Sequence, residues 1–144
     1  MIQKCKTLNL NLVGVAFHVG SGARDVNGFV DAFEDSRLIF DMAQSENIEM
    51  HILDIGGGFP GDNNSFFIEI ANVINQQIKQ RFPSNVKIIG EPGRFLVTSC
   101  TTLVTRIISA EHHFDSMCYF TNEGIYGALN ILHFEDPNTR GYEL

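Results

Sequence analysis

Three glycine-bearing segments hold most of the residues that could do chemistry. They read His-Val-Gly-Ser-Gly at 18–22, Asp-Ile-Gly-Gly-Gly-Phe-Pro-Gly at 54–61 and Gly-Glu-Pro-Gly-Arg at 90–94. Each follows a short run rich in Val, Ile, Leu or Phe, the composition of a buried strand. In α/β folds, the residues after the carboxyl ends of parallel strands line the active site. We therefore expect the three segments to meet in one site.

The middle segment favours a bound phosphate. Gly56, Gly57 and Gly58 offer backbone N–H groups that no side chain hinders, and the Ser21 hydroxyl could add a donor. A tight strand-to-helix turn is the alternative, because glycine serves turns as readily as ligands. Together with Gly61 the segment also matches the Gly-x-Gly-x-x-Gly pattern of dinucleotide-binding domains. That alternative is weaker, because the acidic residue expected about 20 residues later is missing.

The third segment places a carboxylate and a guanidinium close together. Glu91 and Arg94 could simply form a salt bridge with each other. Alternatively, Arg94 and the Gly93 N–H bind a phosphate while Glu91 faces a heteroaromatic nitrogen. At about 4 Å and an effective dielectric near 20, the second pairing is worth about 4 kcal/mol before desolvation, enough to keep a pyridine nitrogen protonated. His18 is either a hydrogen-bonded loop residue or a flat ring that stacks on a cofactor, and Asp54 could orient the glycine loop.

The predicted elements that position these segments alternate between strand and helix. Apolar spacing predicts strand 12–19, helix 25–47, strand 50–55, helix 64–82 and strand 86–89. Asp25 would cap the first helix, Asn64 or Ser65 would open the second, and Pro83 would stop it. The order β-α-β-α-β predicts a parallel sheet.

A different pattern follows the third strand. We expect a short helix at 94–99, then two antiparallel strands at 101–109 and 117–121, connected by 110–116. This divides the chain into residues 1–100 and 101–144. Two strands cannot form an independent sheet domain, and three β-α units cannot close a barrel. We therefore expect the chain to be the middle of a larger molecule.

Composition narrows the classes of partner. The 144 residues are 44% hydrophobic and 19% charged, with a formal charge of −7 and ten Lys and Arg in no basic run. This argues against nucleic acid as a partner and favours a small molecule or a protein. No stretch approaches a membrane span. Three cysteines without a Cys-x-x-Cys pair indicate neither a disulfide framework nor a metal site, and fit the cytoplasm.

Four motifs resemble those of the pyridoxal-phosphate-dependent amino-acid decarboxylases of the ornithine decarboxylase type. They are GVAFHVGSG at 14–22, LDIGGGFPG at 53–61, EPGR at 91–94 and NEGIYG at 122–127, the last similar to the family's Asn-Asp-Gly-x-Tyr-Gly. The resemblance covers nearly the whole chain, although 110–116 is short for the animal enzymes. It implies an α/β fold: the later half of a pyridoxal-phosphate-binding (β/α)8 (TIM-type) barrel, then the beginning of an antiparallel β domain.

The resemblance also implies roles for particular residues. Those assigned to the cofactor are His18, Ser21, Gly56, Gly57, Gly58, Glu91, Gly93 and Arg94. His18 would stack on the pyridine ring, and Glu91 would pair with the ring nitrogen, which makes these two the catalytic residues. Tyr126 and Glu135 would contact the substrate. The family usually has Asp where Glu135 stands, so the identity of the substrate is open.

The implied function is decarboxylation of a basic amino acid, ornithine to putrescine in polyamine synthesis, by a cytoplasmic homodimer. The family lysine that carries the cofactor would precede Met1, and none of Lys4, Lys6, Lys79 or Lys87 replaces it. The family's catalytic cysteine would follow Leu144. We therefore expect residues 1–144 to be inactive alone. The alternative is a non-catalytic regulator resembling the antizyme inhibitors, which act by binding an antizyme-type regulatory protein.

Overall fold

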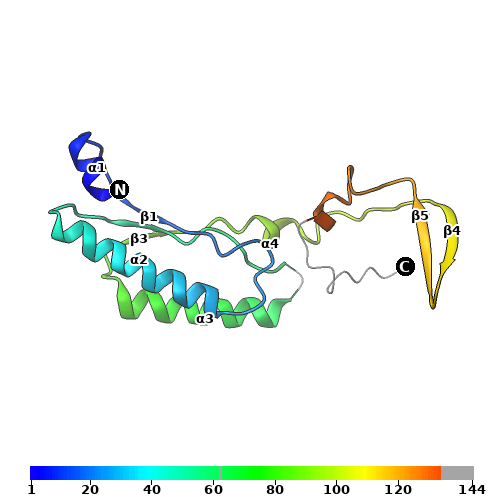
Figure 1. Ribbon diagram of the computed structural model, residues 1–144. Helices are drawn as coiled ribbons and strands as arrows, with labels where there is room; N and C mark the ends of the chain where they lie inside the picture. Colours follow the sequence, from blue (N-terminus) through cyan, green and yellow to red (C-terminus); the bar gives the residue numbers. More distant parts are fainter. Residues whose placement is uncertain (62, 134–144) are drawn as a thin grey trace. The chain divides into compact units, whose positions relative to one another are not determined.

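The computed structural model describes residues 1–61 and 63–133. The chain divides into two units, Met1–Thr101 and a second that begins at Thr102. The first unit contains α1 (Ile2–Thr7), β1 (Gly14–Ala16), α2 (Asn27–Ser45), β2 (Ile52–Asp54), α3 (Asn64–Arg81), β3 (Lys87–Ile89) and α4 (Gly93–Val97) (Figure 1). The second contains β4 (Ile107–His113), β5 (Ser116–Thr121) and the 3-10 helix η1 (Asn130–His133).

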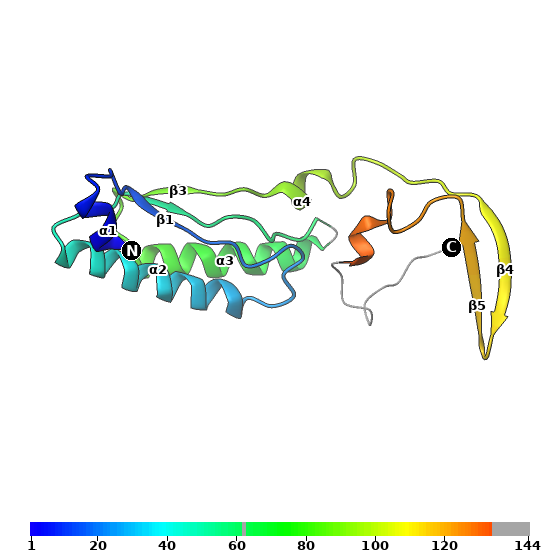
Figure 2. The same ribbon diagram turned by 45° about the horizontal axis from the view of Figure 1, so that its top comes forward.

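The first unit is built on a small parallel sheet with the strand order β1-β2-β3. Gly14 pairs with Ile52, and Ile52 pairs with Lys87. The predicted order β-α-β-α-β is confirmed, although each strand is shorter than expected. The helices α2 and α3 lie side by side along one face of the strands (Figure 2). Because the three strands run parallel, their carboxyl ends lie at the same edge of the sheet.

Aromatic side chains form the centre of the core between the helices and the sheet. Phe33 is fully buried; its ring centroid lies 5.5 Å from that of Phe17 and 6.2 Å from that of Phe82, both in edge-to-face geometry. Phe40 meets Phe82 in the same way at 5.1 Å. Edge-to-face pairs bring the positive ring edge onto the negative face and add to the burial of apolar area. Phe33 therefore ties α2 both to the end of β1 and to the end of α3.

Polar side chains accept backbone N–H groups at the beginning of both long helices. The N-cap position of α2 is Val26 and not the predicted Asp25, but Asp25 Oδ1 accepts the N–H of Asn27, the first residue of the helix, at 2.8 Å. The cap of α3 is Asn63, whose Oδ1 accepts the N–H of Phe66 at 3.0 Å. The prediction of Asn64 or Ser65 was one or two residues late, because Asn and Ser both make good caps and the sequence offers three such residues in a row.

Ion pairs fasten the helices on the outside of the first unit. Arg81 Nη2 lies 2.6 Å from Glu34 Oε1, which joins the end of α3 to α2.

The sequence did not predict α1, which is only six residues long. A salt bridge of 3.2 Å between Lys6 and Glu46 holds α1 against the end of α2. The hydrogen bond from Gln3, and then Lys6, lower the pKa of Glu46.

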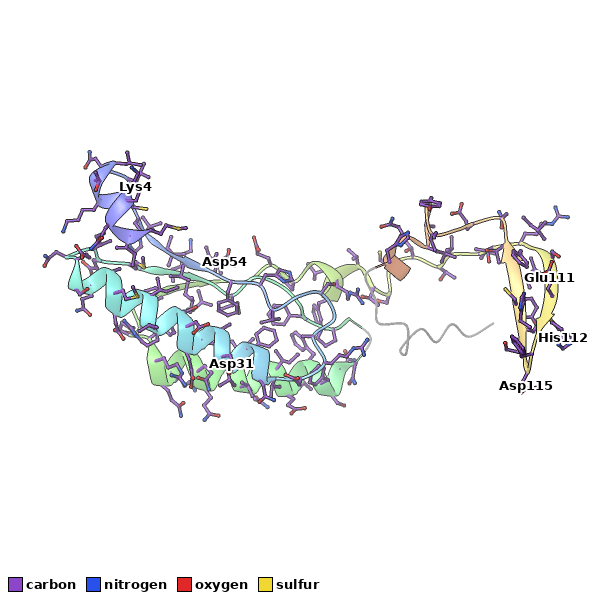
Figure 3. All side chains as sticks on the ribbon, in the orientation of Figure 1. Lys4, Asp31, Asp54, Glu111, His112 and Asp115 are labelled. Carbon is purple, nitrogen blue, oxygen red and sulfur yellow. The ribbon has the colours of Figure 1, made fainter. Side chains whose placement is uncertain are left out.

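The second unit corrects one predicted connection. Residues 110–113 were expected to belong to a loop, but they continue β4 and pair with β5, Ala110 opposite Tyr119 and His113 opposite Ser116. The chain reverses at Phe114 and Asp115, and Phe114 has φ 52°. Figure 3 shows Glu111 and His112 along this hairpin and Asp115 at its tip. Polar residues fit here because every residue of β4 is exposed.

Within residues 1–61 and 63–133, no helix is both long and apolar enough to cross a membrane.

We predict that Phe33→Ala in the full-length protein lowers the free energy of unfolding by about 3–5 kcal/mol, because it leaves a cavity in a fully packed site. Leu38→Ala is the matched control on the same helix; its side chain is 59% exposed, and the change should stay within about 0.5 kcal/mol. Chemical denaturation measures both. Equal losses for the two variants would contradict this description of the core.

Candidate functional site

The first segment, after β1, is fastened to the second by backbone hydrogen bonds. The N–H of Phe17 donates to Asp54 O at 3.0 Å, and the N–H of Ala23 donates to Gly58 O at 3.2 Å. Between these anchors, the N–H of Gly20 donates to His18 Nδ1 at 2.8 Å. That bond requires Nδ1 without a proton, so the neutral ring carries its proton on Nε2. His18 is exposed and its orientation is fixed by its own loop.

The glycine loop owes its shape to left-handed backbone. Gly56 has φ 58° and Gly58 has φ 102°, conformations that other residues adopt only with strain. A Cβ at Gly58 would also lie 2.6 Å from Gly20 O. Asp54 Oδ1 accepts the N–H of Gly56 at 2.9 Å, so Asp54 does orient the loop, as the sequence suggested. Asp54 is labelled in Figure 3.

All three segments meet at Gly57. A Cβ placed there would lie 2.8 Å from Glu91 O and 3.0 Å from His18 Nε2. The N–H of Glu91 donates to Gly56 O at 2.7 Å, which fixes the third segment against the second. The predicted meeting of the three strand ends is confirmed.

Arg94 connects the third segment to the first. Its Nε donates to Ser21 Oγ at 3.0 Å, and its Nη1 lies 3.5 Å from the Cβ position of Gly22. In the part of the chain that the structure describes, no ion pair joins Glu91 to Arg94, so the simple salt bridge between them is not formed.

The turn between these two charged residues uses an N–H group that the sequence analysis assigned to a ligand. The N–H of Gly93 donates to Glu91 O at 2.8 Å, across Pro92 with φ −76° and ψ 59°. These angles are those of an inverse γ-turn. A phosphate at Gly93 would therefore have to share this N–H with the carbonyl of Glu91.

The two expected substrate residues lie elsewhere in the chain. Tyr126 belongs to the second unit, and its side chain is 94% exposed. Glu135 lies outside the described residues. No role was predicted for Gly20 from the sequence, although its N–H donates to His18 Nδ1 and holds the ring. The spacing His-x-Gly at the end of a strand was the signal that could have indicated it.

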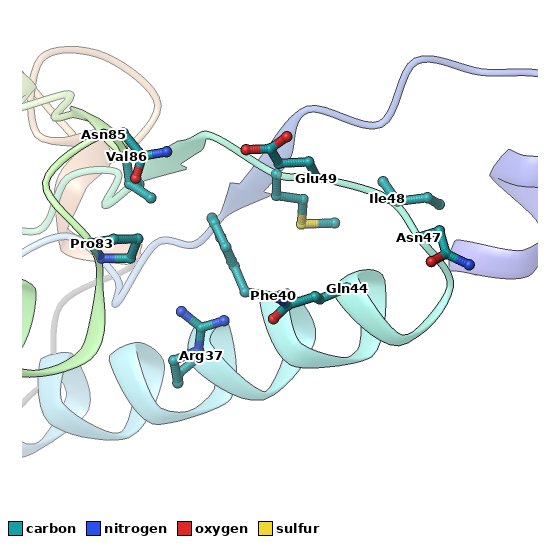
Figure 4. Close-up of a pocket in the computed structure, with 10 residues that line it drawn as sticks. Arg37, Phe40, Gln44, Asn47, Ile48, Glu49, Pro83, Asn85 and Val86 are labelled. Atoms are coloured by element: carbon teal, nitrogen blue, oxygen red, sulfur yellow. The ribbon is translucent and has the colours of Figure 1, made fainter.

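A separate cavity lies at the other end of the sheet. It measures about 470 Å³, and its lining includes Phe40, Glu49 and Val86 (Figure 4). Arg37 also lines it, but its guanidinium already donates to Asp41 and to the carbonyl of Arg81 at 3.1 Å. Arg37 therefore serves to join α2 to the end of α3, and the three loops remain the better candidate site.

The lysines are placed away from the loops. Lys6 lies in α1, where it is paired with Glu46, and Lys4 is in the same helix. Lys87 begins β3, at the amino end of the strand, and Lys79 lies in α3. None of the four is in the three segments that form the candidate site.

Residues 1–98 match the model of a family described as pyridoxal-dependent decarboxylase, pyridoxal binding domain. The chain belongs to this family. The match confirms the resemblance inferred from the motifs, and it covers all three segments of the candidate site. The cofactor of the family is a pyridoxal group, as the sequence analysis expected.

Individual relatives agree with this assignment. Ornithine decarboxylase of Mus musculus is 39% identical over 158 residues, covering 97% of this chain and 34% of the relative. Antizyme inhibitor 2 of Xenopus laevis is 40% identical over 156 residues, with the same shares covered. Arginine decarboxylase of Paramecium bursaria Chlorella virus has a TM-score of 0.80 at 34% identity, covering 93% of this chain and 36% of that structure. The chain thus spans about a third of the length of these proteins.

We predict that Asp54→Ala destabilises the full-length protein by about 1–3 kcal/mol, because the N–H of the buried Gly56 loses its acceptor. Asp54→Asn keeps an oxygen at this position and should retain most of the stability. Chemical denaturation and the exchange rate of the Gly56 amide measure the effect. If Asn is as damaging as Ala, the charge of Asp54 rather than this hydrogen bond is what matters.

Proposed function

We propose that the protein to which this chain belongs decarboxylates a basic amino acid with pyridoxal 5'-phosphate, and that its substrate is ornithine, giving putrescine for polyamine synthesis. The observation that carries the proposal is the meeting at Gly57: backbone without a side chain lies against His18 Nε2 on one side and the Glu91 segment on the other. Arg94, held on Ser21, completes the same set of loops.

The residues present fit this cofactor. The backbone at Gly20 and Gly93 is open, since a Cβ at either position would meet no atom within 4 Å. The Ser21 hydroxyl and the Arg94 guanidinium are donors suited to a phosphate. Gly56 already gives its N–H to Asp54, so the backbone donors of the glycine loop would be Gly57 or Gly58. Open backbone beside a positive charge suits the phosphate end of the cofactor.

Glu91 and His18 would act on the ring end. The cofactor's pyridine ring, when bound, accepts the electron pair released as carbon dioxide leaves the substrate. The exposed Glu91 carboxylate has no competing ion pair with Arg94 in the described residues, so it can hold a proton on the ring nitrogen. His18, oriented by Gly20, presents a flat face for stacking.

The fold supports a larger assembly of the same kind. Three parallel strands with two helices on one face would form one part of a (β/α)8 barrel, and the β4-β5 hairpin would begin an antiparallel β domain. The relatives are about three times longer than this chain. We propose that the complete protein is a cytoplasmic homodimer. Solved relatives include a lysine/ornithine decarboxylase of Vibrio vulnificus in complex with cadaverine and with putrescine, which supports a diamine-sized product.

A regulatory function is the alternative, because antizyme inhibitor 2 is as similar to this chain as the ornithine decarboxylases are. The presence of His18, Glu91 and Arg94 together at the loops favours the enzyme. A protein that acts only by binding a regulator does not need these three side chains in one site. Cofactor binding separates the two functions.

We predict that the full-length protein binds pyridoxal phosphate saturably and that Arg94→Ala weakens this binding about 10- to 150-fold, the equivalent of losing a charge-assisted hydrogen bond of about 1.5–3 kcal/mol. Lys79→Ala, which removes an exposed charge from α3, is the control and should bind normally. Titration followed by cofactor absorbance measures both. Absence of saturable binding by the parent protein would favour the regulatory alternative.

We predict that Glu91→Gln folds normally but lowers turnover by orders of magnitude, because a neutral amide cannot hold the ring nitrogen protonated. Carbon dioxide release from ornithine, arginine and lysine, at saturating cofactor in the full-length protein, measures the effect and identifies the substrate. Glu69→Gln, an exposed change on α3, is the control. A Glu91→Gln rate within a few-fold of the parent would assign Glu91 a structural role only.

A further inference from the structure

Gly61, the last residue of the glycine loop, lies directly against the turn of chain that carries Arg94. A Cβ at Gly61 would overlap Thr98 Oγ1, and would lie 2.6 Å from Thr98 Cβ and 2.9 Å from Arg94 O. Gly61 is not among the glycines with positive φ, which are Gly20, Gly22, Gly56 and Gly58. The need for glycine at position 61 is therefore a matter of space and not of backbone conformation.

The atoms that Gly61 faces are held in place. Thr98 Oγ1 donates to Arg94 O at 2.7 Å, and the N–H of Thr98 donates to the same oxygen at 3.0 Å. Rotating the Thr98 side chain would break the first bond and would leave its Cβ where it is. The helix α4 is also supported by α3, because the rings of Phe95 and Phe67 stack with centroids 4.2 Å apart. A side chain at Gly61 would thus have to displace α4 itself.

From this contact we infer that Gly61 is a positioning residue: its missing side chain lets α4 approach the glycine loop closely enough for Arg94 to stand at the phosphate end of the cofactor. The inference rests on the proposed function, because it concerns the same cofactor. Arg94 lies one helical turn before Thr98, so a displacement of α4 would shift the guanidinium from its place at Ser21 Oγ and beside Gly22. Glu91 and His18 are held by separate hydrogen bonds and would keep their places.

The phosphate group provides a sharp test. In the full-length protein, Gly61→Ala should weaken binding of pyridoxal phosphate by roughly tenfold or more, the equivalent of one charge-assisted hydrogen bond. Binding of pyridoxal, which lacks the phosphate, should change by less than about threefold, because the ring end is not disturbed. Gly28→Ala is the matched control, since the nearest atom to its Cβ position is 3.9 Å away. It should bind both compounds like the parent.

A second variant tests the contact itself. Gly61→Ala combined with Thr98→Gly removes both Thr98 side-chain atoms that the new methyl group would meet and leaves only the contact of 2.9 Å with Arg94 O. The double variant should therefore restore part of the preference for pyridoxal phosphate over pyridoxal. If Gly61→Ala alone fails to fold, this double variant decides: recovery of a folded protein that binds pyridoxal phosphate supports the inference, and no recovery overturns it.

The remaining outcomes separate this inference from the proposed function. If the parent protein binds neither compound, the proposed cofactor function fails and the inference falls with it. If the parent prefers pyridoxal phosphate and Gly61→Ala keeps that preference, only the role of Gly61 is overturned. Equal loss of both compounds by Gly61→Ala would also overturn it, because general destabilisation would then explain the result.

Discussion

The first unit depends on how closely its three strand ends approach one another where side chains are absent. At Gly57 even one methyl group would fall 2.8 Å from Glu91 O and 3.0 Å from His18 Nε2, and at Gly58 it would fall 2.6 Å from Gly20 O. The hydrogen bonds that join the segments need this proximity, since the N–H of Glu91 reaches Gly56 O and the N–H of Ala23 reaches Gly58 O. Glycine here gives up side-chain packing, and loses more chain entropy on folding than other residues, in return for close contact between backbones.

Close contact between backbones also decides which side chains can work together. Arg94 is turned toward Ser21, while Glu91 leaves the third strand end beside Gly57 and His18. A γ-turn at Pro92 separates the two charges over a very short stretch of chain. In the proposed function, Arg94 would present a positive charge to one end of a small molecule and Glu91 a negative charge to the other. This separation of opposite charges suits a ligand that has an anionic group at one end and a protonated ring at the other.

The sequence predicted the alternation of strands and helices well, because buried strands and amphipathic helices such as the one bearing Phe29, Phe33 and Phe40 have strong periodicity. It also predicted that the three segments would meet, since parallel strands place their ends together. It missed α1, which is too short to show a period, and the extent of β4, whose polar residues are all exposed. The partner of Arg94, the tautomer of His18 and the engaged N–H of Gly93 depend on loop dihedral angles, which no spacing of residue types determines.

Each strand of the parallel sheet is only three residues long and runs straight into a loop of the site. So short a sheet has few ladder hydrogen bonds of its own, and the bonds between loops add to them directly. A ligand that contacts several of these loops would then stabilise the whole parallel sheet. By mass action, a ligand present at 100 times its dissociation constant adds about 2.7 kcal/mol to the stability of the state that binds it. In the proposed function, binding of the cofactor would in this way raise the free energy of unfolding of the protein as well as fill the site.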